Sequence, residues 1–365
     1  MTVPTSLTWA EVHAARARRH LLCGTADLVP PPGSAVAGRL AGIQAQVEST
    51  AGLCLSARFP RASATQVTQS LAAPGLARLW AMRGTLHLVP TSDVHRYAAA
   101  LGDSVAAAQR RLWPRYGVPA DAEQAVNAAL VEALDDGPLP RAALATRVGM
   151  RLGPAYTRLL SHPWGIGLKP AVARGLIATE GAGRTLTLRL PAPAVAAAVG
   201  TVDRQVAQAW LAGLYLAANV AGTAASFAAW AGLPRGQARA GLAAATDRRV
   251  RIGGFDHALC WKIEDADAGP AEVRLVPAFD PFVLAVADKA GWTTTGGAID
   301  RIFRAGGWVS AVVLRAGAPV GVWELSKGRR RSVVLDVFDR LDRQATAQLT
   351  AESGRVEEYI AAAGT

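Results

Sequence analysis

The clearest architectural signal in the chain is TAASFAAWAGLPRGQARAGLAAATDRRVRIGGFDHALCWKIE, residues 223–264. Thr223 can cap a short alanine-rich helix, and Pro234 opens a second helix where its missing N–H costs nothing. RRVRI and ALCWKI then flank a GGFDH turn with strand-forming residues, which predicts a β-hairpin. Helix, tight turn, helix and hairpin in this order predict a winged helix, a unit that binds DNA with one helix and its hairpin.

Weaker versions of this pattern occur earlier in the chain. Pro140 starts a helix with RAALATRV, and GLIATEGAGRTLTLRL predicts a hairpin with its turn near residues 181–183. In the first third, a series of helices leads to LWAMRGTLHLVP, where Gly84–Val89 has strand character. The chain is therefore predicted to be mainly α with β-hairpins, an α+β fold built from two or three related winged-helix units in tandem.

Several further elements can be read outside these units. Thr8 and Glu11 have the spacing of a capping box for a helix that ends near Gly24, and Ser34 is expected to cap a short helix. VRLVPAFDPF predicts a buried strand that ends in a turn. WVSAVVLRAG, APVGVWEL and SVVLDVF predict three more strands, and a helix over about residues 342–360 closes the chain.

The composition limits the class of protein. A chain of 365 residues with 51% hydrophobic residues can bury a sizeable core in two or three compact units. Its 39 Lys and Arg against 28 Asp and Glu give a formal net charge of +11, which favours nucleic acid or an anionic membrane surface as a partner. A solvated basic surface without a partner is the alternative.

Cysteine usage and hydropathy argue against several other classes. Cys23, Cys54 and Cys260 are far apart and form no CxxC pair, so neither a zinc site nor a disulfide framework is expected, and no metal or other cofactor. The N-terminus lacks the apolar segment of a signal peptide, which predicts a cytoplasmic protein. The uncharged run 205–233 is read as two buried helices rather than a membrane span.

A basic turn and the histidines are candidates for chemistry. SKGRRR places Lys327, Arg329, Arg330 and Arg331 at a hairpin tip, where they could meet DNA phosphates or serve only as a charged sheet edge. No HxxxH pair, GxSxG elbow, P-loop or GxGxxG fingerprint occurs, so a metal or nucleotide enzyme is not expected. A histidine placed like His87, in RGTLHLVP, is more often a structural residue.

Two glutamines lie one residue apart in AGIQAQVEST, residues 41–50. On a helix Gln44 and Gln46 would face nearly opposite sides, whereas on extended backbone they share one face. Spacing alone favours a helix in which each amide makes an ordinary polar contact. If they act together, the stretch must be extended or kinked.

The motifs together resemble a known family. IQAQ, then RGTLHLVP, then LVPAFDPF are similar to the AlkZ/YcaQ family of bacterial DNA glycosylases over nearly the whole chain. The resemblance implies three tandem winged helices in a C-shaped DNA-binding channel, which we expect over residues 1–135, 136–200 and 201–365. It also implies that Gln44 and Gln46 are the catalytic motif, in a double-glutamine form similar to a branch from antibiotic-producing actinomycetes.

The resemblance carries a predicted activity. The family's C-terminal hairpin inserts into DNA, and the SKGRRR turn is the candidate for it. The expected enzyme is a monofunctional DNA glycosylase (EC 3.2.2.-) that removes cationic N7- or N3-alkylated purines, bulky adducts and interstrand crosslinks, for self-resistance to a DNA-alkylating natural product. Glu48, Arg83 and His87 are candidate supporting residues. The expected partner is double-stranded DNA, with no membrane or metal, bound by a monomer.

Two other functions are alternatives. One is a winged-helix DNA-binding regulator without enzymatic activity, which fits the charge and the repeats equally well but does not explain paired glutamines on extended backbone. The other is a resistance protein that sequesters a drug without cutting DNA. Release of a base from alkylated DNA separates the enzyme from both.

Overall fold

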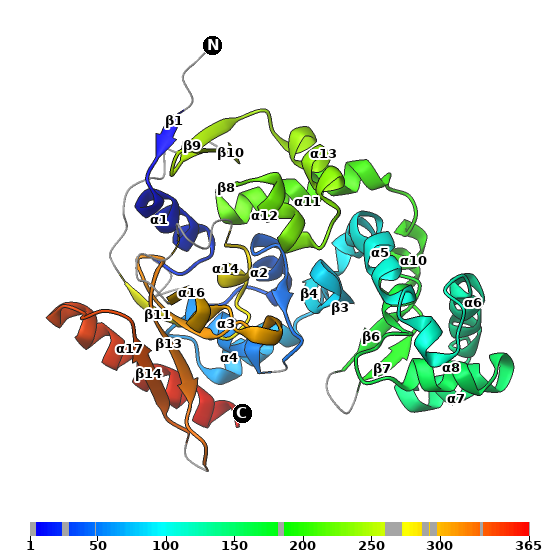
Figure 1. The fold of residues 1–365 in the computed structure, drawn as a ribbon. Coiled ribbons are helices and arrows are strands. Elements are labelled where there is room, and N and C mark those ends of the chain that lie inside the picture. The colour runs from blue at the N-terminus through cyan, green and yellow to red at the C-terminus, as the bar shows by residue number, and fades with distance from the viewer. Residues whose placement is uncertain are drawn as a thin grey trace. The chain divides into compact units, whose positions relative to one another are not determined.

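The computed structural model describes residues 5–23, 29–47, 49–181, 186–259, 272–286, 292, 298–328 and 331–364. The chain forms two compact units (Figure 1). Unit 1 comprises residues 1–74, 213–227 and 244–365, and unit 2 comprises residues 75–212 and 228–243. Both units mix helices with antiparallel sheet, so the α+β class is confirmed.

Unit 1 contains the first and the last described segments of the chain. Its helices are α1 (Trp9–Arg19), α2 (Gly33–Arg39), α3 (Thr50–Arg58), α4 (Ala64–Ala72), α14 (Pro281–Leu284), α16 (Ala298–Ile302) and α17 (Arg343–Ala363), with a 3₁₀ turn at Ala305–Gly307. Its strands are β1 (Thr5–Leu7), β2 (Ile43–Gln44), β8 (Ala221–Gly222), β9 (Arg249–Ile252), β10 (Phe255–Leu259), β11 (Val273–Val276), β12 (Ala311–Arg315), β13 (Ala318–Leu325) and β14 (Val333–Val337).

Two four-stranded sheets organise unit 1. One has the order β1-β9-β10-β8, and the other is an antiparallel meander in the order β11-β12-β13-β14. The hairpin predicted from RRVRI and ALCWKI is confirmed in part: β9 and β10 pair around a two-residue turn, where Gly253 and Gly254 supply the positive φ angles of 57° and 85°. The predicted GGFDH turn is too long, because β10 already begins at Phe255, and residues 260–263 of the predicted second strand lie outside the described residues. Trp323 and Val313 of the meander share a buried apolar cluster with Leu349 of α17.

Unit 2 contains the middle of the chain. Its helices are α5 (Val94–Arg110), α6 (Glu123–Ala133), α7 (Arg141–Leu152), α8 (Pro154–Ser161), α9 (Lys169–Ala173) and α10 (Pro193–Ala198), with 3₁₀ turns at Met82–Gly84, Thr91–Asp93 and Trp113–Tyr116. Its strands are β3 (Leu76–Trp80), β4 (Leu86–Pro90), β5 (Leu139–Pro140), β6 (Ala178–Glu180) and β7 (Thr187–Arg189), which run β4-β3-β6-β7-β5. Three helices are shared between the two units along the chain: α11 (Arg204–Asn219), α12 (Ala224–Ala231) and α13 (Arg235–Ala245).

Helix boundaries test the capping predictions. Thr8 and Glu11 form the predicted capping box, although α1 ends at Arg19 rather than near Gly24. Ser34 as a cap is wrong, because α2 begins one residue earlier and Pro32 precedes it. The cap at Thr223 is confirmed: its hydroxyl accepts the N–H of Ser226 at 3.1 Å.

Several sequence predictions at element ends are correct. Pro140 and Pro234 directly precede α7 and α13, and the final helix α17 follows its cap Asp342. The run 205–233 forms two helices, broken at Val220, whose φ is 69°. No helix among the described residues is long and apolar enough to cross a bilayer. The predicted turn at 181–183 lies largely outside the described residues.

Candidate active site

The glutamine stretch follows helix α2 through a tight turn. Ala41 and Gly42 have φ angles of 55° and 103°, and the N–H of Gly42 donates to the carbonyl of Ala37 at 2.7 Å. Because this turn ends α2, the chain continues as the short strand β2, and Gln44 lies on extended backbone. The helical alternative for this stretch is therefore wrong.

The two glutamine side chains differ in their contact with solvent. Gln44 is buried, with 5% of its surface exposed, whereas Gln46 is exposed in the bend that follows β2. Thr50 is the first residue of α3, and its hydroxyl donates to the carbonyl of Val47 at 2.7 Å. The same hydroxyl lies 3.3 Å from the carbonyl oxygen of Gln44. One hydroxyl thus ties the glutamine turn to the start of α3. That both amides act from one side of the chain stays a prediction.

The last residue of α3 carries a buried ion pair. The guanidinium of Arg58 donates to both carboxylate oxygens of Asp280, at 2.8 and 2.9 Å, and both side chains are 0% exposed. Burial opposes the charge of Arg58, but the carboxylate of Asp280 raises its pKa above the ordinary value. Asp280 lies in the AFDPF turn, where it also accepts the N–H of Phe282 at 2.9 Å. The IQAQ and AFDPF motifs are therefore linked through one helix.

The middle of α3 is held by the C-terminal helix α17 (Figure 1). Arg355 donates to the hydroxyl of Ser56 at 2.7 Å and pairs with Glu352 at 2.7 and 2.9 Å. A Cβ atom on Gly52 would lie 2.5 Å from the hydroxyl oxygen of Tyr359. A larger residue at position 52 would therefore displace the end of the Tyr359 side chain.

Neither Arg58 nor Asp280 stands out in the sequence as one member of a pair. Two signals point to them. Arg58 is the only charge in AGLCLSARF, residues 51–59, and Asp280 is enclosed by Phe279 and Pro281. A lone charge in an apolar run needs a buried partner, because burying it unpaired is costly.

The basic turn lies between β13 and β14, as predicted. The hairpin is closed by the N–H of Ser326, which donates to the carbonyl of Ser332 at 2.8 Å. Lys327 and Arg331 are exposed, whereas Arg329 and Arg330 lie outside the described residues. The described part of the tip thus presents two cations to solvent.

The remaining candidate residues lie apart from the glutamine stretch in sequence. Nδ1 of His87 lies 2.9 Å from the carbonyl oxygen of Thr85, and burial followed by the charge of Arg83 lowers the pKa of His87 to about 3. His87 is therefore neutral near pH 7. Arg83 is exposed, has a φ of 56°, and donates to the carbonyl of Trp230 at 2.5 Å. Glu48 lies outside the described residues.

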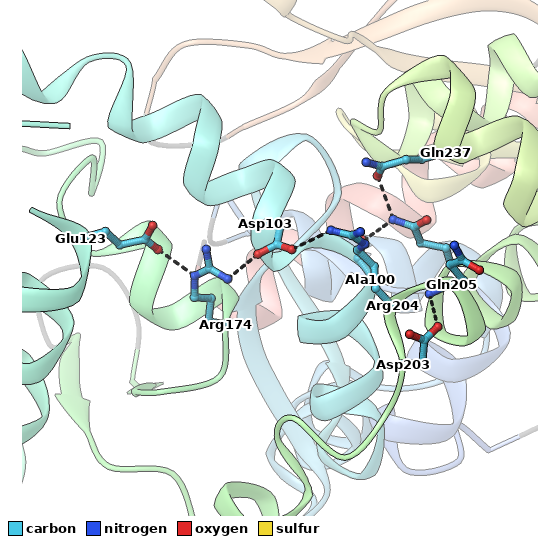
Figure 2. A network of polar contacts seen from close by, with 9 residues as sticks. Ala100, Asp103, Glu123, Arg174, Asp203, Arg204, Gln205 and Gln237 are labelled. Carbon is cyan, nitrogen blue, oxygen red and sulfur yellow. Dashed lines mark hydrogen bonds and ion pairs between the residues drawn. The ribbon is translucent and has the colours of Figure 1, made fainter. Parts of the chain in front are cut away.

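A chain of ion pairs lies in unit 2 (Figure 2). Arg174 donates to Glu123 at 2.7 Å and to Asp103 at 2.5 Å, and Arg204 donates to Asp103 at 3.2 Å. The side-chain hydrogen bond from Arg174 is the largest of the effects that lower the pKa of Asp103. Because these cations already face carboxylates, we give this network no part in the site. Over the described ranges, no three His, Cys, Asp or Glu side chains are grouped to hold a metal.

Comparison with known proteins places the chain in a family. Residues 37–359 match the family described as DNA glycosylase AlkZ-like. An interstrand DNA cross-link repair glycosylase from Streptomyces sahachiroi is 29% identical over 361 residues, 96% of this chain and 95% of that protein.

The fold agrees with a solved structure. The DNA glycosylase AlkZ of Streptomyces sahachiroi superimposes with a TM-score of 0.83 at 26% identity, covering 97% of each chain. The family match over residues 37–359 includes all three motifs. The chain therefore belongs to the AlkZ-like family and is a DNA glycosylase.

Proposed function

We propose that this enzyme hydrolyses the N-glycosidic bond of purines made cationic by alkylation at N7 or N3, including bulky adducts and interstrand crosslinks. The observation that carries the proposal is the glutamine turn itself, with one buried and one exposed amide and no carboxylate between residues 41 and 47. The cross-link repair glycosylase of Streptomyces sahachiroi supports crosslinked DNA as a substrate.

The chemistry suits amide side chains. Alkylation leaves a positive charge on the purine, so the C1′–N9 bond breaks with its electron pair passing to a base that departs neutral. Water adds to C1′ of the oxocarbenium-like sugar and loses a proton to solvent. An amide carbonyl can orient this water and stabilise the developing charge, and one such group is worth about 10²–10³ in rate. A normal base lacks the charge and is left intact.

The two glutamines have different parts in this proposal. The exposed Gln46 contacts the water and the sugar, because its amide can be reached from solvent. The buried Gln44 adds the dipole of its own amide to the turn. No lysine lies in the turn to form a Schiff base, so the reaction ends at an abasic site without strand cleavage.

The rest of the chain would hold DNA. We propose three winged-helix units over residues 1–135, 136–200 and 201–365 that bind DNA as a monomer, with Lys327, Arg329, Arg330 and Arg331 inserted at the groove. The net charge of +11 and the exposed tip between β13 and β14 support this arrangement. Arg83 and His87 act as support. We further propose that the enzyme protects its host from a DNA-alkylating natural product.

The direct test measures base release. Duplexes that contain one N7-methylguanine or one nitrogen-mustard crosslink are incubated with the protein, and abasic sites are counted after mild alkali. We expect release from both and none from undamaged DNA. Tight binding without release from any cationic lesion would refute the enzyme mechanism and favour a drug-sequestering or regulatory protein.

Gln46→Ala should lower the single-turnover rate about 10²–10³-fold, because it removes the amide that orients water. Since Gln46 is exposed, the melting temperature of this variant should match the wild type. Gln44→Ala should lose activity and also some stability, because its side chain is buried. DNA affinity should persist in both. Equal activity of Gln46→Ala and wild type would remove Gln46 from the mechanism.

Lys327→Ala combined with Arg331→Ala should weaken DNA binding and reduce the slope of log K against log salt by about 0.9 for each phosphate that is no longer neutralised. The matched control is Arg147→Ala combined with Arg151→Ala, because these guanidinium groups already pair with Asp136 and Glu132. A salt titration of binding distinguishes them. Identical slopes would remove the hairpin from the DNA interface.

A further inference from the structure

We infer that Arg58 and Asp280 are positioning residues for the glutamine turn and act on it through helix α3. The inference rests on the glycosylase mechanism proposed above. Both side chains are fully buried, so neither touches a reacting atom. Their effect on catalysis must pass through the helix that joins them to Gln44 and Gln46.

Helix α3 is a short, stiff connection between the glutamine turn and the Arg58–Asp280 pair. It has nine residues, which gives a length of about 13 Å at 1.5 Å per residue. Thr50 at its first residue holds the carbonyl groups of the glutamine turn, and Arg58 at its last residue holds Asp280. A displacement at one end is therefore carried to the other.

Helix α3 has no side-chain cap at its start. Ser49 precedes the helix but makes no side-chain capping hydrogen bond. The orientation of the helix therefore depends on its tertiary contacts. Three of these contacts come from distant segments: Arg355 at Ser56, Tyr359 at Gly52, and Asp280 at Arg58.

The bidentate pair supplies geometry more than stability. A buried ion pair gains little free energy over an apolar pair of the same shape, because both charges lose their water. Its two parallel hydrogen bonds, however, fix the rotation and the axial position of α3, which sliding apolar contacts do not. A further bond from Arg58 to the carbonyl of Cys54, at 2.8 Å, fixes the guanidinium within its own helix.

The test uses a variant that keeps the fold but removes the pair. Arg58→Met combined with Asp280→Asn leaves no unpaired buried charge and keeps an oxygen to cap Phe282. We expect the single-turnover release of N7-methylguanine to fall about 10²-fold while DNA affinity stays unchanged, since a misplacement of about 1 Å can cost this much. Hydrogen exchange in residues 41–47 should become faster.

Two controls separate positioning from general loss of stability. Val12→Ala, in α1 of the same unit and 3% exposed, should lower the melting temperature but leave the rate and the exchange of residues 41–47 unchanged. Arg58→Lys keeps the charge but loses the two parallel hydrogen bonds of the guanidinium. Its rate of base release should lie between those of the wild type and the double variant.

Each outcome decides between the proposals. An active wild type with an equally active double variant overturns the positioning role and leaves the glycosylase mechanism standing. If the double variant loses no more activity than Val12→Ala at the same melting temperature, the positioning role is also overturned. If the wild type releases no base, the glycosylase mechanism fails and the catalytic role of the pair fails with it, whereas unchanged exchange overturns the structural link alone.

Discussion

Two ion-pair networks join distant segments of this chain, and they differ in their contact with water. The Arg58–Asp280 pair in unit 1 is 0% exposed, whereas Asp103 in unit 2 is 54% exposed and shares two arginines (Figure 2). Water screens the second network and replaces any bond that it loses. The first has no such replacement, so its geometry is enforced.

The difference shows which ion pairs can fix the relative positions of the segments that they join. A pair that solvent can substitute allows its helices to move by fractions of an ångström at little cost. A buried bidentate pair has one favourable arrangement. Any movement that breaks it leaves a buried charge unpaired, which costs several kcal/mol. We therefore expect substitutions in the two networks to differ in size.

The largest effect is expected from Asp280→Ala. This change leaves the guanidinium of Arg58 buried without its carboxylate and removes the cap of α14, so the free energy of unfolding should fall by about 3–5 kcal/mol. Urea unfolding measures it. A loss below about 1 kcal/mol would mean that water reaches the site, and the contrast between the networks would disappear.

For each buried histidine, an intermediate effect is expected from acid. Burial lowers the pKa of His13 to about 4 and of His87 to about 3, and with the charges of Arg16 and Arg58 it keeps the pKa of His20 far below 6.5. Below pH 6.5 these histidines bind protons in the unfolded chain but stay neutral in the folded chain. The free energy of unfolding is therefore highest above pH 6.5 and decreases as the pH falls below it. Each histidine should remove up to about 1.4 kcal/mol per pH unit.

Urea unfolding between pH 7 and pH 5 measures this slope. His87→Gln should reduce it by the share of one histidine, because glutamine does not titrate. A free energy of unfolding that is constant over this range would show that the histidines gain protons as readily in the folded chain.

The smallest effect is expected from Asp103→Asn. Its carboxylate is 54% exposed, so losing the charge should cost less than about 1 kcal/mol, and the difference from wild type should shrink further in about 1 M NaCl. Urea unfolding at low and high salt measures both. A loss as large as that of Asp280→Ala would mean that exposure does not separate the two networks.

Local sequence patterns predicted the elements whose causes are local. The Gly253–Gly254 turn, the capping box at Thr8 and Glu11, and the helix after Pro140 follow from neighbouring residues alone. The cap at Ser34 failed because helix α2 begins at Gly33, and its N-cap residue Pro32 makes no side-chain capping hydrogen bond.

The site was less predictable, because its causes are distant in sequence. Spacing favoured a helix for Gln44 and Gln46, but the positive φ angles of Ala41 and Gly42 turned the chain into a strand. Resemblance to the family corrected that preference. The pairing of Arg58 with Asp280 spans 222 residues, and no local pattern encodes it.

The discontinuous make-up of unit 1 has a consequence during protein synthesis. The glutamine turn leaves the ribosome early, but Asp280 and α17, which hold α3, follow after more than two hundred residues. At the usual rates of translation, these partners arrive roughly tens of seconds later. A nascent chain therefore presents the glutamine turn before α3 has its contacts with Asp280 and α17, and these contacts form only when the last helix has docked.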